Sequence, residues 1–263
     1  MEKLARLGYA TKGIVYGIIG ILAVMAAFTA GGQTTGTQGA LGFIASQPFG
    51  QFLLVITAIG LIAYALWRLI EAIQDPEHKG SDSKAIAQRV GYAISGLLYG
   101  ALAVQAILIV VGKMSQSQAS SGGNNSKADW TAWVMQQPFG RWIIGLIGAI
   151  IVGVGFYRIY KAYKVKFRRK LNLAELDPEQ TTWAVRISRI GIAARGVVFI
   201  LIGFFLLQAS AQYDPNEVKG LDGILGTLAA QPYGKFLLGL IAIGLVAYAI
   251  YMLIQSRYRR INV

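Results

Sequence analysis

Residues 47–52 read Gln47-Pro48-Phe49-Gly50-Gln51-Phe52, and they open an apolar run that continues to residue 73. The pattern Gln-Pro-aromatic-Gly returns twice, as Gln137-Pro138-Phe139-Gly140 and as Gln231-Pro232-Tyr233-Gly234, and an apolar run follows each copy. Self-similarity at matched positions is typical of a repeat architecture. We therefore expect a chain built from three copies of one unit.

The start of each unit carries a second signature, a basic residue followed by an aliphatic residue and a glycine. The three copies are Arg6-Leu7-Gly8, Arg89-Val90-Gly91 and Arg189-Ile190-Gly191. Another glycine follows each opening, and an aromatic residue comes one turn later: Gly13 and Tyr16, Gly96 and Tyr99, Gly196 and Phe199. These signatures divide the chain into units at 1–78, 79–170 and 171–263.

Each unit contains two long apolar stretches. Hydrophobic residues form 55% of the chain and charged residues 14%, whereas a soluble domain carries about a quarter charged residues. The stretches lie at 8–30, 49–73, 90–112, 139–162, 190–211 and 233–255, and each reaches the roughly 20 residues that a spanning helix needs. The sequence predicts an all-α, multi-pass membrane bundle of six transmembrane helices. Units of two spans keep one orientation, so we expect a pseudo-threefold arrangement about the membrane normal.

Most positive charges outside the apolar stretches lie on one side. Three of these residues, Lys113, Lys127 and Lys219, follow the first helix of a unit. Sixteen lie at the termini or after the second helix of a unit: Lys3, Arg6, Lys79, Lys84, Arg89, Lys161, Lys164, Lys166, Arg168, Arg169, Lys170, Arg186, Arg189, Arg257, Arg259 and Arg260. The positive-inside rule predicts cytoplasmic termini and a place in the bacterial inner membrane. The same distribution argues against nucleic acid as the reason for the net charge of +13.

Glycines recur within the apolar stretches. The first helices of units one and two carry Gly13-x-x-x-Gly17 and Gly96-x-x-x-Gly100, and the fourth stretch carries Gly145, Gly148, Gly153 and Gly155. Small residues let membrane helices approach closely. We expect tight helix contacts at these glycines.

Four basic residues inside the apolar stretches qualify as candidates: Lys12, Arg68, Arg158 and Arg195. Lys12 and Arg195 share one repeat position, and Arg68 and Arg158 share another. Ionisable residues within membrane spans are candidates for function. One interpretation is that these long side chains extend to the inner lipid headgroups. The other is a basic ring at the inner end of the bundle that holds an anion or an anionic lipid headgroup.

The Gln-Pro pairs also have two interpretations. Proline fits the first turn of a helix, and a glutamine side chain can bond the free backbone N–H groups at a helix start. Alternatively, Gln47, Gln137 and Gln231 face outward around the axis and contact a ligand. Short apolar segments before the three pairs predict helical turns on the outer surface.

Several kinds of chemistry have no candidate residues. The chain has no Cys and one His, His78 in a polar loop, which argues against thiolate and histidine metal sites. We expect no metal, no cofactor and no catalytic residues, because no pairing of a nucleophile with a base appears. Glu71 is the only acidic residue in the apolar stretches. It lies near the end of its stretch and one turn from Arg68, so we expect an ion pair with Arg68 and not a proton- or sodium-coupled pump.

The Arg-x-Gly openings joined to the Gln-Pro-aromatic-Gly pattern resemble a bacterial membrane-protein family known only as domain of unknown function 1206. The resemblance covers nearly the whole chain, and it implies three tandem two-helix domains with arginine and tyrosine near the helix ends. The third unit departs from that pattern at Ile192 and Met252. The family implies no activity.

Two classes of function fit these observations. The first is a non-enzymatic scaffold or accessory protein that binds a protein partner or anionic lipid at its basic cytoplasmic face. The second is a passive channel or carrier for a small solute or anion along the pseudo-threefold axis. A close-packed axis favours the first and a continuous polar path favours the second. The many glycines indicate close packing, so we expect the first.

Overall fold

The structure, a computed structural model, describes residues 2–28, 34–74, 82–115, 130–172 and 177–259. Within these ranges, six helices are long and apolar enough to cross a membrane. They are α1 (Glu2–Phe28), α3 (Gly50–Ile73), α4 (Ser83–Val110), α6 (Gly140–Tyr163), α7 (Pro178–Gln212) and α9 (Gly234–Tyr258). The prediction of a six-helix membrane bundle is confirmed.

Short helices precede the second long helix of each unit. They are α2 (Thr37–Ser46), a helical segment at 130–135 and α8 (Leu221–Ala229). Two 3₁₀ turns, η1 (Lys166–Lys170) and η3 (Pro215–Glu217), complete the described elements. The first long helix of each unit begins several residues before its apolar stretch, because a polar first turn extends it. In α4, for example, the side chain of Asp82 caps the helix start and accepts from the backbone N–H of Ala85.

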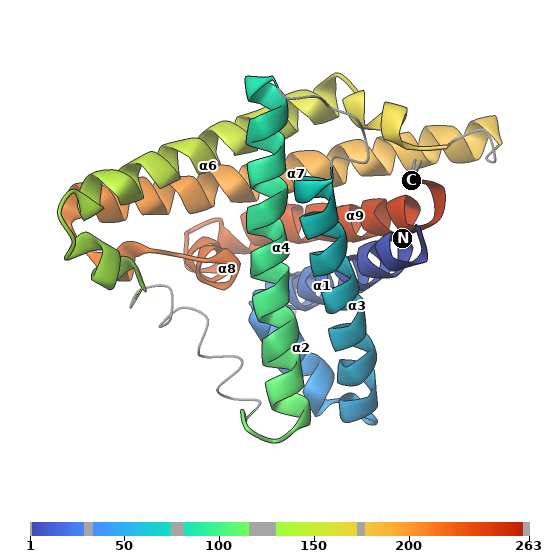
Figure 1. Cartoon of the computed structure of the whole chain (residues 1–263), viewed down its shortest axis with the longest axis horizontal. Helices are drawn as coiled ribbons and strands as arrows, with labels where there is room; N and C mark the ends of the chain where they lie inside the picture. Colours follow the sequence, from blue (N-terminus) through green and yellow to red (C-terminus); the bar gives the residue numbers. More distant parts are fainter. Residues whose placement is uncertain (1, 29–33, 75–81, 116–129, 173–176, 260–263) are drawn as a thin grey trace.

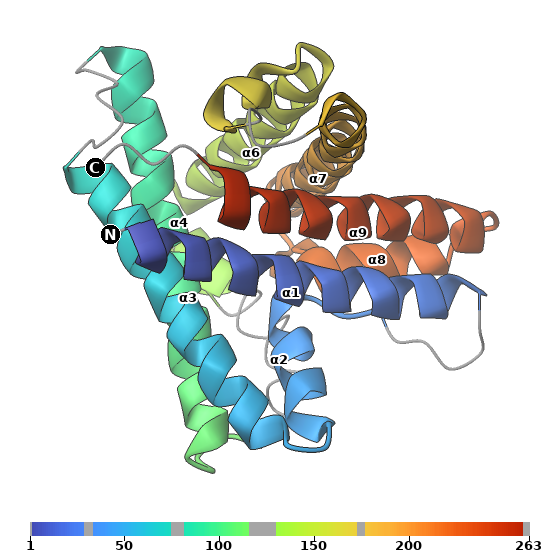
Figure 2. The same cartoon turned by 90° about the vertical axis from the view of Figure 1, so that its right-hand side faces the viewer.

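The three most extensive helix interfaces join different units. α3 of the first unit packs on α4 of the second, α6 of the second packs on α7 of the third, and α9 of the third packs on α1 of the first. The α3–α4 pair runs across the α6–α7 pair in Figure 1 and across the α1–α9 pair in Figure 2, and the starts of α3, α6 and α9 point away from one another. Pairing between units therefore joins the three repeats into a ring.

Glycines permit the close approach of the paired helices. A Cβ atom on Gly155 would lie 2.8 Å from the carbonyl oxygen of Gly196, and one on Gly196 would lie 2.9 Å from that of Gly155. Two turns away, Gly148 and Gly203 face each other in the same manner. Similar contacts involve Gly13 and Gly20 on α1 and Gly96 on α4. Backbone-to-backbone contact thus replaces side-chain packing along these seams.

The arginine of the repeat opening ties α4 to α3 and α1 to α9 at their ends. Arg89 donates from Nε and Nη2 to the carbonyl oxygens of Ala72 and Ile73, at 2.7 and 2.8 Å, and so caps the end of α3. Arg6 donates in the same way to the carbonyl oxygens of Ser256 and Arg257 at the end of α9. A cation at a helix C-terminus also interacts favourably with the helix dipole.

The Gln-Pro-aromatic-Gly signature is a tight turn between two helices, and not the first turn of the second helix as its proline indicated. The backbone N–H of Gly50 donates to the carbonyl oxygen of Gln47 at 2.8 Å, and α3 begins only at Gly50. Proline occupies the second position of this β-turn, where its fixed φ is favourable. The side-chain amide of Gln47 donates to the carbonyl oxygen of Phe43 at 3.3 Å. The glutamine therefore caps the end of α2 and not the start of α3.

The second unit departs from the symmetry of the other two. In the first unit Gly8 lies against Tyr64 of α3, and in the third Gly191 lies against Tyr248 of α9. The equivalent Gly91 of α4 has no such neighbour, because a Cβ atom there would have no heavy atom within 4 Å. In the described part of the chain, α4 and α6 form no interface comparable with α1–α3 or α7–α9. The second unit is therefore open between its two long helices.

Candidate functional site

Four buried tyrosines lie where helices of different pairs meet. They are Tyr16 on α1, Tyr64 on α3, Tyr99 on α4 and Tyr248 on α9, and none is more than 9% exposed. The rings of Tyr16 and Tyr248 pack edge to face with centroids 5.1 Å apart, and those of Tyr64 and Tyr99 do so at 4.6 Å. This arrangement matches positive ring edges to negative ring faces. We name these four residues the tyrosine cluster.

Lys12 lies inside the tyrosine cluster. It is 8% exposed, and its Nζ donates to the hydroxyl oxygen of Tyr64 at 2.9 Å. The same Nζ lies 4.7 Å from the ring centroids of both Tyr64 and Tyr99. Aromatic faces attract a cation, and this attraction offsets part of the free energy that the cation loses when it gives up its hydration. Lys12 is thus held among the tyrosines of the core.

Arg68 and Arg259 share the carboxylate of Glu71. Glu71 is 1% exposed, and its oxygens lie 2.7 Å from Nη1 of Arg68 and 2.6 Å from Nη2 of Arg259. The predicted pair between Arg68 and Glu71 is confirmed, but Glu71 is buried deeply although it lies near the end of α3. Arg68 also donates from Nε to the hydroxyl of Tyr64 at 2.8 Å, and Arg259 donates to the hydroxyl of Tyr9. Burial lowers the pKa of Arg259 to about 10, which leaves it protonated at neutral pH.

Arg195 has aromatic neighbours but no hydrogen-bond acceptor among the described residues. Its guanidinium carbon lies 4.7 Å from the ring centroid of Tyr16 and 4.8 Å from that of Phe199. Arg158 also lies over the ring of Phe199, with its guanidinium carbon 4.6 Å from the ring centroid. Its Nε is buried without a hydrogen-bond partner. Both guanidinium groups therefore have donors available for a ligand.

Positive charge exceeds negative charge in this region. We name Lys12, Arg68, Arg158 and Arg195 the cationic core, because they share aromatic neighbours. Lys12 and Arg68 both contact Tyr64, Lys12 and Arg195 both lie over Tyr16, and Arg195 and Arg158 both lie over Phe199. The two oxygens of Glu71 already bond Arg68 and Arg259. Within the described ranges, no carboxylate lies within ion-pair distance of Lys12, Arg158 or Arg195. The arrangement is thus suited to an anion.

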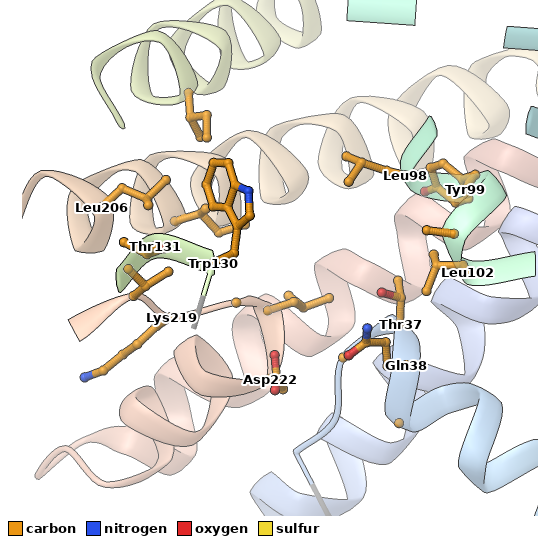
Figure 3. A pocket seen from close by; sticks show the side chains of 18 of the residues that line it. Thr37, Gln38, Leu98, Tyr99, Leu102, Trp130, Thr131, Leu206, Lys219 and Asp222 are labelled. Atoms are coloured by element: carbon orange, nitrogen blue, oxygen red, sulfur yellow. The ribbon is translucent and has the colours of Figure 1, made fainter. Parts of the chain in front are cut away.

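A cavity of 620 Å³ adjoins the tyrosine cluster, between α4 on one side and α6 and α7 on the other. Leu98 and Tyr99 of α4 lie across it from Trp130, Thr131 and Leu206 (Figure 3). Arg195, Tyr16 and Tyr99 belong to the cavity lining, so the cavity reaches the cationic core. The aliphatic side chains of Leu102, Ile144, Ile147, Ile151 and Ile202 also line it, together with the polar side chains of Thr37, Gln38 and Gln105.

The structure does not bring the three glutamines of the repeat signature together. Gln47, Gln137 and Gln231 directly precede the starts of α3, α6 and α9. These starts lie at the outer tips of three different helix pairs (Figures 1 and 2). The four residues of the cationic core lie close together, whereas the three glutamines do not.

Three residues of the site were missed in the sequence: Tyr64, Tyr248 and Arg259. Tyr64 and Tyr248 occupy one repeat position, fourteen residues after the signature glycines Gly50 and Gly234. Alignment of the second helices would have found both tyrosines. Arg259 gives no such signal, because its role depends on the close approach of the end of α9 to Glu71.

The fold and the site define a multi-pass α-helical membrane protein, in which three tandem two-helix units surround a charged, tyrosine-rich core. The chain belongs to the family described as Domain of Unknown Function (DUF1206), whose model matches it three times, at residues 7–75, 90–165 and 190–259.

A relative in Bacillus subtilis (strain 168), named "Uncharacterized protein YxxB", is 32% identical over 262 residues. The match covers 100% of this chain and 92% of that protein, so the two share their whole architecture. No solved structure matches the chain.

Proposed function

We propose that this protein is a non-enzymatic membrane protein that binds an anion, the headgroup of an anionic lipid, at its cationic core. The observation that carries the proposal is that Lys12 is buried and Arg158 and Arg195 are half-buried, with no carboxylate within ion-pair distance among the described residues. Burying an unpaired charge costs several kcal/mol. A bound anion removes that cost, and basic pockets between membrane helices are suited to acidic headgroups.

Positive charge outside the core supports a location at the cytoplasmic side of the bacterial inner membrane. The basic run at 161–170 includes the end of α6 and the turn η1, and Phe167, which is fully buried against Tyr251, fixes it to the bundle. The backbone N–H of Asn172 donates to the carbonyl oxygen of Tyr258 at 2.6 Å, so this run lies beside the end of α9. Anionic lipids would concentrate at such a face and supply the ligand. The same face can dock an acidic protein partner, as an accessory protein would require.

A passive channel or carrier for a small anion is the second candidate function. The cavity favours it, because the lining includes Lys219 and Asp222, in the segment after α7, as well as Arg195. The tyrosine cluster argues against a pore along the axis, since the four rings pack on one another there. Anion flux in proteoliposomes distinguishes the two candidates: a binding protein gives the flux of empty liposomes.

Native mass spectrometry of the purified protein tests the lipid proposal. We expect wild-type protein to retain phosphatidylglycerol in preference to phosphatidylcholine, and the double variant Arg158→Gln with Arg195→Gln to lose that preference. Arg186→Gln, an exposed charge on α7, is the matched control and should retain it. Equal retention of phosphatidylglycerol by the double variant and by the control would contradict the proposal.

A further inference from the structure

The ligand of the cationic core has a second chemical feature besides its negative charge. We propose that it is an anionic amphiphile, whose head lies at Arg195 and one of whose alkyl chains occupies the cavity between α4 and α6. The inference rests on the proposed function, because it takes the anion site as given and adds the nature of the attached group.

The size and the lining of the cavity support an alkyl chain. A volume of 620 Å³ is typical of sites for small organic ligands and far exceeds the need of an inorganic anion. Leu98, Leu102, Ile147, Ile151 and Ile202 give it an aliphatic wall. Such a wall offers nothing to a small hydrated anion, but it packs well on methylene groups.

Charge fixes the direction of the amphiphile. At one end of the lining, Arg195 faces Tyr16 with no carboxylate within ion-pair distance in the described ranges. Elsewhere the lining contains one cation, Lys219, and one carboxylate, Asp222, so that part of it carries no net charge. The net attraction for an anionic head is therefore at Arg195, and the chain extends away from it along the aliphatic wall.

The open second unit provides a route from the membrane. In units one and three, Tyr64 and Tyr248 fill the space beside Gly8 and Gly191. Unit two carries Val154 at that position, and Val154 is 38% exposed instead of packing on Gly91. A smaller side chain thus accompanies the gap between α4 and α6. An amphiphile dissolved in the bilayer can enter sideways through this gap, with its chain remaining in an apolar environment.

Photolabelling of the reconstituted full-length protein tests the inference. The probe is palmitate with a diazirine on its chain. We expect crosslinks on residues 98–105 and 144–151, which unlabelled palmitate suppresses, and loss of these crosslinks in Ile147→Trp, whose indole fills the cavity. Leu146→Trp is the control, because Leu146 is 63% exposed on the outside of α6. Leu102→Trp repeats the test from α4 if Ile147→Trp fails to fold.

The outcomes separate the inference from the proposed function. Labelling that is lost in both Ile147→Trp and Arg195→Gln supports both. Labelling that is unchanged in both filling variants but lost in Arg195→Gln overturns the cavity as the chain site and leaves the anion site intact. Labelling that is unchanged in Arg195→Gln overturns the assignment of the head. A parallel arm with phosphatidylglycerol carrying the diazirine on one chain shows whether the anionic head is a carboxylate or a lipid phosphate.

Discussion

At the scale of single residues, the carboxylate of Glu71 balances the positive charge of Arg68 and Arg259. In Glu71→Gln, Arg68 and Arg259 remain buried and lose the carboxylate that both now bond. Removal of one partner from a buried ion pair costs about 3–5 kcal/mol, mostly because an unpaired charge stays inside. We therefore expect a strong loss of thermal stability, measured by the unfolding of purified protein in detergent.

Glu2 provides the control for this prediction. It pairs with Arg6 at 2.7 Å, but both side chains are substantially exposed. An exposed pair contributes at most about 1 kcal/mol, so Glu2→Gln should leave the unfolding temperature almost unchanged. Similar shifts for the two variants would show that Glu71 does not sustain the buried arginines.

The sequence predicted part of this site. Arg68 and Glu71 are one helical turn apart, and that spacing alone indicated the pair. The depth of Glu71 was not predictable from its place near the end of a span, because burial there depends on Arg259, which is 188 residues away. The cationic core was identified by the rarity of charges in apolar stretches. Its convergence on tyrosines required the packing of the helices.

At the scale of elements, the α6–α7 seam depends on glycine. In Gly155→Ala, the new Cβ atom would lie 2.6 Å from Ile200 Cγ1 and 2.8 Å from the carbonyl oxygen of Gly196. Backbone cannot move aside cheaply, so we expect a loss of about 1–3 kcal/mol. Gly153→Ala is the matched control on the same helix, because nothing lies within 4 Å of a Cβ atom there. It should stabilise α6 by at most about 1 kcal/mol. Denaturation of both variants under one condition gives the comparison.

The gap between α4 and α6 at Val154 allows a second prediction at the scale of elements. Val154→Tyr gives the second unit the tyrosine that the other two units carry at this position. We expect the new ring to occupy the gap between α4 and α6 and to reduce palmitate photolabelling. Tyr157→Phe, on an exposed residue of the same helix, should leave labelling at the wild-type level. Unchanged labelling in Val154→Tyr would place the entrance elsewhere.

Sequence patterns predicted which helices form but not how they pair. Apolar length gave all six long helices. The glycine faces indicated the close contacts at Gly13, Gly96, Gly148 and Gly155, but the contact expected at Gly153 is absent. A glycine face shows that another helix approaches closely without specifying which one, so the pairing of α3 with α4 and of α9 with α1 was open. The start of α3 was predicted at Pro48, two residues too early, because proline is common both at the first position of a helix and in a β-turn.

At the scale of the whole molecule, we expect loop charge to set the orientation in the membrane. The chain has no native cysteine, so single substitutions give clean labelling. We expect a membrane-impermeant maleimide to label Ser46→Cys, at the end of α2, from outside sealed spheroplasts. Ser83→Cys, at the start of α4, should react only after permeabilisation. The reverse pattern would invert the bundle and place the cationic core on the outer side.

A cryo-EM map of the protein in nanodiscs that contain phosphatidylglycerol tests most directly whether the cationic core holds an anionic amphiphile. The account predicts elongated density that begins at the guanidinium group of Arg195 and continues between Leu102 of α4 and Ile147 of α6. A map in which Val154 packs against Gly91, with α4 closed on α6 and no density beside Arg195, would contradict it.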